Sequence, residues 1–126
     1  MSIAPYSPPS EGRSAVEWTK EEVIRAYREA TPALRAAFDF LADRPDEEAK
    51  SLDLAREVYP EDNDVDAESR LYGVLGGLGK AAYRYGKKRW FFDANRERMP
   101  DGSAGYMVYV MPAREAAWLR EASGRE

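Results

Sequence analysis

The chain contains no cysteine and no histidine among its 126 residues. Without cysteine it can form no disulfide, no zinc–thiolate site and no thiol nucleophile. Without histidine it lacks the usual general base at neutral pH and the commonest nitrogen ligand of metal ions. We therefore expect no metal site and no cofactor, and we predict that the protein is not an enzyme. The missing cysteine also fits a reducing compartment, so we expect a cytoplasmic location.

Long apolar runs are missing as well. No stretch approaches the roughly 20 apolar residues that a membrane-spanning helix needs, so we expect no membrane partner. The stretch MSIAPYSPPSEGRS has neither the basic region nor the apolar region of a secretory signal. A composition of 44% hydrophobic and 33% charged residues is typical of a soluble globular protein. We predict a flexible tail over residues 1–15 and one domain over residues 16–126.

Charge is distributed unevenly along the chain. The formal net charge is −4, which argues mildly against non-specific nucleic-acid binding. Residues 70–98, however, hold 8 of the 19 basic residues and only 2 of the 23 acidic ones. This basic segment inside an acidic protein is the first indication of a functional surface.

Short sequence signals predict five helices. Thr19-Lys20-Glu21-Glu22 has the form of a capping box, in which the threonine hydroxyl accepts a hydrogen bond from the Glu22 amide. Thr31-Pro32 places a good N-cap before a proline at the first helical position. We expect Ser51 to cap the third helix and Asp64 or Asp66 to cap the longest one. The predicted ranges are 20–30, 32–43, 52–59, 67–85 and 113–122.

A β-hairpin is predicted between the last two helices. Gly86 is expected to end the longest helix in the left-handed conformation, and beyond it the apolar period changes from 3.6 to 2. Residues 89–94 and 106–111 are rich in aromatic and β-branched side chains, and they flank the turn-forming stretch 96–105. The sequence thus predicts an α+β, mainly helical fold.

The predicted helix 67–85 has two different faces. One face is apolar, and the opposite face is formed by glycines and cations. An interior glycine costs a helix roughly 0.5–1 kcal/mol relative to alanine, so the glycines call for an explanation. Bare backbone would allow close approach to a sugar-phosphate chain. Alternatively, the glycines let a neighbouring helix pack tightly, or they break the helix near Gly76-Gly77.

The order of these elements resembles the winged helix-turn-helix family over about residues 31–122. The likeness comprises helix 32–43, short helix 52–59, long helix 67–85, the hairpin 89–111 as a wing, and a closing C-terminal helix. Helix 20–30 would be an extra N-terminal helix. The segment Leu71–Phe92, with Gly-Gly-Leu-Gly followed by Arg-Tyr-Gly, is also similar to uncharacterised winged-helix-like proteins of actinobacteria.

The resemblance implies that helix 67–85 lies in a major groove and that the wing lies on the adjacent backbone or minor groove. The side of the helix that would face DNA carries Ser69, Arg70, Gly73, Lys80 and Arg84. The run of cations and aromatics over residues 84–92 adds further phosphate contacts, which are Lys87, Lys88 and Arg89. In a wing, Arg96 and Arg98 would reach the minor groove or its phosphates. The same cations are also compatible with an ordinary solvated surface.

Duplex DNA binding is therefore our leading hypothesis, as a transcription regulator or a small nucleoid- or phage-associated factor. Two features depart from the family pattern: the acidic loop 60–66 would lie close to the DNA, and the helix face lacks the Asn, Gln or second Arg that usually reads base edges. The second feature favours phosphate contact over the reading of bases. A protein-interaction module is the alternative, since the apolar face of helix 20–30 could form a homodimer or dock a protein partner. RNA binding is third, with Tyr83 or Tyr85 stacking on unpaired bases.

Overall fold

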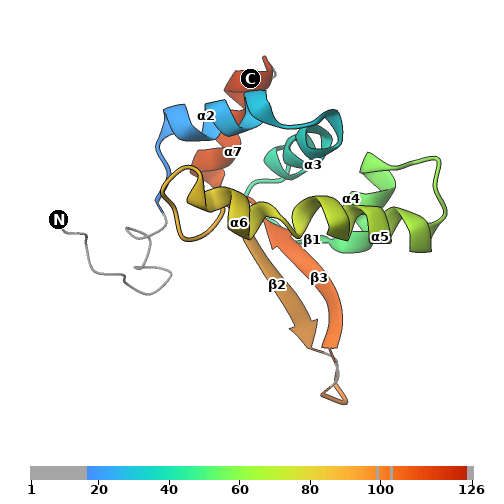
Figure 1. The fold of residues 1–126 in the computed structure, drawn as a ribbon. Coiled ribbons are helices and arrows are strands. Elements are labelled where there is room, and N and C mark those ends of the chain that lie inside the picture. Colours follow the sequence, from blue (N-terminus) through green and yellow to red (C-terminus); the bar gives the residue numbers. More distant parts are fainter. Residues whose placement is uncertain (1–16, 99, 103, 125–126) are drawn as a thin grey trace.

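The computed structural model describes residues 17–98, 100–102 and 104–124, so the predicted tail over residues 1–15 lies outside the described residues. The fold is α+β and mainly helical, as predicted (Figure 1). Its elements, in chain order, are α2 (Lys20–Glu29), α3 (Pro32–Ala42), β1 (Ala49–Lys50), α4 (Ser51–Val58), α5 (Asp64–Leu75), α6 (Leu78–Tyr83), β2 (Asp93–Arg98), β3 (Ala104–Val110) and α7 (Ala113–Ser123).

Two of the predicted helix starts are confirmed. The Glu22 amide donates to Thr19 Oγ1 at 3.2 Å, and the Thr19 amide donates to Glu22 Oε1 at 2.9 Å, which completes the capping box of α2. Thr31 Oγ1 accepts from the Leu34 amide at 3.3 Å, and proline follows it at the start of α3. Local sequence determines these ends because all the partners lie within three residues of one another.

The other two predicted caps are wrong. Ser51 is the first residue of α4 and is fully buried, while Lys50 occupies the cap position. Asn63 caps α5, because its Oδ1 accepts from the Asp66 amide at 2.9 Å. Asp64 instead lies in the first turn of α5, where its negative charge interacts favourably with the helix dipole. It also forms an ion pair with Arg56 of α4, across the loop between the two helices. In both cases a contact with another helix takes the side chain away from the capping role.

The predicted long helix 67–85 is two helices in the structure. It begins earlier, at Asp64, and α5 stops at Leu75 before α6 begins at Leu78. Gly76 and Gly77 form the junction, which is the break that the sequence left open as one explanation of the glycines. A Cβ on Gly76 would lie 2.7 Å from the Tyr72 carbonyl oxygen, so this junction requires a residue without a side chain.

The sheet has three antiparallel strands in the order β1-β3-β2. The central strand β3 pairs Tyr109 with Ala49 on one side and with Ala94 on the other. The predicted strand 89–94 is wrong over its first four residues, since β2 begins at Asp93 and continues to Arg98. The turn is correspondingly shorter than the predicted 96–105, and the two-residue strand β1 was too short to give a sequence pattern.

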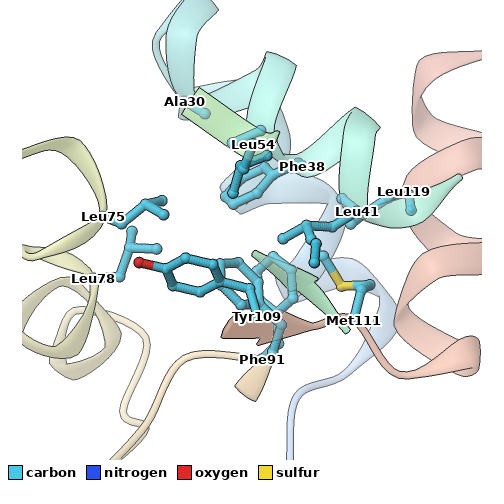
Figure 2. Packing of buried hydrophobic residues seen from close by; sticks show 14 of the residues in the cluster. Ala30, Phe38, Leu41, Leu54, Leu75, Leu78, Phe91, Tyr109, Met111 and Leu119 are labelled. Atoms are coloured by element: carbon cyan, nitrogen blue, oxygen red, sulfur yellow. The ribbon is translucent and has the colours of Figure 1, made fainter. Parts of the chain in front are cut away.

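Residues 90–92 leave the strand register because their rings enter an aromatic cluster. Trp18, which precedes α2, is 2% exposed, and its ring centroid lies 4.9 Å from that of Trp90 and 5.1 Å from that of Phe91. Phe38 of α3 is fully buried against the same side chains. Figure 2 shows Phe38, Phe91 and Tyr109 facing one another in the core. The cluster joins segments more than 70 residues apart, which no local period could predict.

Helix α2 packs against α7 at the end of the molecule opposite the hairpin (Figure 1). Val23 and Ala26 are buried, and Tyr27 is half-buried with its hydroxyl donating to Asp39 at 3.1 Å. The apolar face that the sequence offered for a homodimer or protein partner is therefore packed largely inside the domain. Ile24 of that face stays half-buried.

Candidate nucleic-acid interface

Helices α4 and α5 form a closely packed pair joined by the acidic loop, and β2 and β3 project away from it (Figure 1). Three side chains fix the angle of the pair. Ser51 Oγ, at the start of α4, donates to Glu68 Oε2 of α5 at 2.6 Å. Tyr72 Oη donates to the same carboxylate at 3.2 Å and lies 3.0 Å from Ser51 Oγ. Since this network is partly buried and internally satisfied, it holds α5 in one orientation relative to α4.

The outer face of α5 exposes Ser69, Arg70 and Gly73, three of the predicted contact residues. Its charge is largely neutralised. Arg70 donates to Asp62 at 2.8 Å, and its guanidinium lies over the Tyr59 ring, 4.2 Å from the centroid. This hydrogen bond raises the pKa of Arg70 further. The predicted contact of Arg70 with phosphate would therefore require the ion pair with Asp62 to open.

Helix α6 and the loop after it carry the more available cations. Lys80, Arg84 and Lys88 are exposed, and none of the three forms an ion pair with another of the residues that the structure describes. Tyr83 lies between Lys80 and Arg84 in the sequence and is 67% exposed. Gly79 is exposed too, and a Cβ built on it would meet no atom within 4 Å. This part of the predicted surface is open.

Lys87 and Arg89, by contrast, are tied to the domain. Lys87 is half-buried, and its Nζ lies 2.9 Å from Glu22 Oε1 of α2. Burial by itself would raise the pKa of Glu22, but hydrogen bonds from Thr19 and Lys87 lower it overall. The guanidinium of Arg89 lies 3.6 Å from the Asp93 carboxylate. The backbone carbonyl of Arg89 accepts a hydrogen bond from Trp18 Nε1 at 2.9 Å. The densest basic run in the sequence is thus partly an internal structural element.

Tyr85 is held inside the domain and is not available for stacking on nucleic-acid bases. Its ring lies 5.0 Å from the ring of Trp18, and its hydroxyl donates to Glu29 at 2.6 Å. Burial, followed by this hydrogen bond, raises the pKa of Tyr85 to about 12. Tyr83 is the tyrosine of the pair that remains exposed.

The hairpin contributes Arg96, which is exposed on β2 and lines a shallow cleft with Gly76 and Tyr72 of α5. Arg98 closes β2, but its side chain lies outside the described residues. The structure therefore brings Arg96 next to the α5–α6 junction, while Lys80 and Arg84 lie further along α6.

Sequence reasoning missed Trp18 as a determinant of this surface. By their positions in the sequence, Trp18 and Val23 flank the capping box as a hydrophobic staple would, which is only a local contact at the start of a helix. In the structure the Trp18 ring contacts Tyr85 and Trp90, and its Nε1 donates to the Arg89 carbonyl oxygen. Trp18 thus holds both sides of the basic loop after α6, which is residues 84–92. The one signal in the sequence was a large aromatic residue just before a predicted helix. Such a signal indicates burial but does not identify partners about 70 residues along the chain.

Within the described ranges, no group of three His, Cys, Asp or Glu side chains could hold a metal ion. Nor does any described helix have the length and apolar character needed to cross a membrane. Comparison of the chain with protein-family models, with curated proteins and with solved structures found no match.

Proposed function

We propose that this protein has a winged helix-turn-helix fold and binds duplex DNA, mainly through phosphate contacts. The observation that carries the proposal is the placement of exposed cations beside a helix pair and a projecting hairpin. Helices α4 and α5 are followed by Lys80, Arg84 and Lys88 on α6 and its loop, and Arg96 lies on the hairpin. A helix pair that places its second helix in the major groove, with a hairpin on the adjacent backbone, is an established way of docking on DNA.

The charges on α5 limit how the helix can approach DNA. Asp62, Asp64 and Asp66 surround its N-terminal end, and the first two already occupy Arg70 and Arg56 in ion pairs, so this end is unfavourable for phosphates. From the middle of α5 onward the surface presents Ser69, then Gly73, and then α6, where the backbone is accessible and the cations begin. We therefore place the contact at the C-terminal half of α5, at α6 and at the hairpin. Phosphate contacts position a protein without reading sequence, so binding should depend weakly on the bases.

The test is fluorescence anisotropy with a random-sequence duplex over a series of salt concentrations. Four phosphate contacts, from Lys80, Arg84, Lys88 and Arg96, predict a slope of log K against log salt of about −3.6. The double variant Lys80→Glu/Arg84→Glu should lose binding and lower the steepness of the salt dependence.

A matched control is Arg28→Glu/Arg120→Glu, which changes the net charge equally but on α2 and α7. This control should bind like the wild type, because both helices lie at the end opposite the hairpin (Figure 1). Equal loss in the two double variants, or wild-type affinity in Lys80→Glu/Arg84→Glu, would contradict the proposed surface.

A second candidate, the binding of single-stranded nucleic acid, is favoured by Tyr83. Its exposed ring is flanked by two cations, and base stacking on an aromatic side chain is worth about 1–3 kcal/mol per base. Competition between a duplex and a single-stranded RNA of equal length separates the two functions. Preference for the single strand, lost in Tyr83→Ala, would replace the duplex proposal.

A further inference from the structure

A cleft of about 290 Å³ separates the α5–α6 junction from the start of β2. Its floor is apolar and consists of Leu75, Leu78, Phe92 and Tyr109, all of them buried. Gly79 forms part of the edge and leaves it open because the residue has no side chain. A concave apolar site with a few polar groups is the usual form of a small-molecule site, and this volume is at the small end of the range.

The floor holds an unused hydrogen-bond donor. The ring of Tyr109 is 3% exposed, and Figure 2 shows its hydroxyl pointing toward Leu75 and Leu78. The hydroxyl makes no hydrogen bond to any residue that the structure describes. Burial, with smaller contributions from Tyr72 and Glu68, raises the pKa of Tyr109 to about 12. The group therefore stays protonated at physiological pH and can donate to an acceptor.

The rim adds a positive charge. Lys88 lines the cleft, is exposed, and has no ion pair with the described part of the chain. Arg89 and Asp93 also line the rim, but they compensate each other at 3.6 Å. The cleft thus combines an apolar floor, a neutral donor at its base and one uncompensated cation at its mouth.

Trp90 forms another part of the wall and provides a local reporter. Its indole Nε1 is buried and has no hydrogen-bond partner among the described residues. Buried donors without a partner are rare because they lose their hydration without replacement. Trp90, which carries such a donor, therefore lines the same cleft as Tyr109.

We propose that this cleft binds a small aromatic carboxylate that carries a second oxygen at the far side of its ring. The ring would lie on Leu78 and Phe92, the carboxylate would lie near Lys88, and the distal oxygen would accept from Tyr109 Oη. A carboxylate complements the unpaired ammonium group, whereas a cationic ligand would be repelled by it. The inference does not depend on DNA binding, since it concerns only the cleft.

Three probes test the parts of this assignment. They are 6-hydroxy-2-naphthoate, 2-naphthoate without the distal oxygen, and 2-naphthol without the carboxylate. Binding is measured by isothermal titration calorimetry and by the indole N–H signals of ¹H–¹⁵N spectra, assigned with Trp90→Phe. We expect 6-hydroxy-2-naphthoate to bind most tightly and to shift the Trp90 signal, while that of Trp118 on α7 stays in place.

The variants then separate the contributions. Lys88→Ala should weaken both carboxylates about two- to five-fold, the range of an exposed ion pair, and should leave 2-naphthol unchanged. Tyr109→Phe should remove the preference for 6-hydroxy-2-naphthoate over 2-naphthoate. Gly79→Leu should fill the cleft and abolish binding of all three probes. Gly73→Leu is its control, because Gly73 is equally open but does not line the cleft.

Thermal unfolding followed by circular dichroism verifies that each variant is folded before titration. Three results would overturn the proposal: no saturable binding of any probe at millimolar concentration, binding that Gly79→Leu does not affect, or 2-naphthol binding as tightly as the carboxylates. Concentration-dependent self-association that is lost in Gly79→Leu, without probe binding, would assign the cleft to a second copy of the chain instead.

Discussion

Helices α5 and α6 come from one continuous helical pattern, yet their surroundings differ. The cations near α5 are paired, Arg56 with Asp64 and Arg70 with Asp62. The cations of α6 and its C-cap, Lys80 and Arg84, have no ion pair within the described chain. Basic residues in a sequence are therefore not equivalent, because the fold decides which of them keep a charge available for a ligand.

The two helices are also held in place differently. Glu68 and Tyr72 of α5 bond directly to Ser51 of α4. Helix α6 is short, has no side-chain cap, and is followed by a loop that Trp18 holds from outside the helix pair. Contacts within the α4–α5 pair thus determine the orientation of α5. The position of the basic loop after α6 depends instead on Trp18, in the segment that precedes α2.

The largest expected effect concerns the anchor of the basic loop. Trp18→Ala should destabilise the protein by about 3–5 kcal/mol, because it leaves a cavity among Tyr85, Trp90 and Phe91 and removes the hydrogen bond to the Arg89 carbonyl. Urea unfolding followed by circular dichroism measures the change. Tyr83→Ala is the control, since that exposed ring should contribute less than about 0.5 kcal/mol. Similar losses in both variants would contradict the anchoring role of Trp18.

An intermediate effect is expected at the α4–α5 network. Ser51→Ala should reduce the free energy of unfolding by about 1–3 kcal/mol, because Glu68 loses a short hydrogen bond in a partly buried site. The variant Glu68→Gln/Ser51→Ala tests the coupling, since its loss should be smaller than the sum of the two single losses. Strict additivity would show that the two side chains do not stabilise the helix pair together.

The smallest effects, of opposite sign, are expected at the junction. Gly77→Ala should stabilise the protein by up to about 1 kcal/mol, because its negative φ and open surroundings accept a side chain. Gly76→Ala should destabilise it by about 1 kcal/mol, since the new Cβ meets the Tyr72 carbonyl oxygen. Thermal unfolding of both variants gives the comparison. A stabilising Gly76→Ala would mean that α5 and α6 can join into one straight helix.

Much of the helical fold was predictable from sequence. The capping box at Thr19, the N-cap at Thr31, the helix over 113–122 and the left-handed Gly86 were all correct, because each depends on neighbours within one turn. The strand over 89–94 was wrong although Trp90, Phe91 and Phe92 have high strand propensity. Their rings are buried more favourably against Trp18 and Phe38 than they would be along the edge of the hairpin.

The candidate site was predictable only as a list of charges. Exposed Lys80, Arg84 and Lys88 agree with the prediction of an accessible basic segment, whereas Lys87 pairs with Glu22 and Arg70 with Asp62. The cleft beside Tyr109 had no sequence signal, because its walls come from α5, α6, the loop and both hairpin strands.

The sequence by itself determined the approximate extent of most helices, the hairpin, and the concentration of positive charge over residues 70–98. Only the tertiary structure decided where the long helical pattern breaks, which cations are neutralised, and that an open cleft lies beneath α6. The physical reason is range. Caps and periodicity depend on residues a few positions apart, whereas ion pairs, aromatic burial and cavities depend on segments brought together by packing.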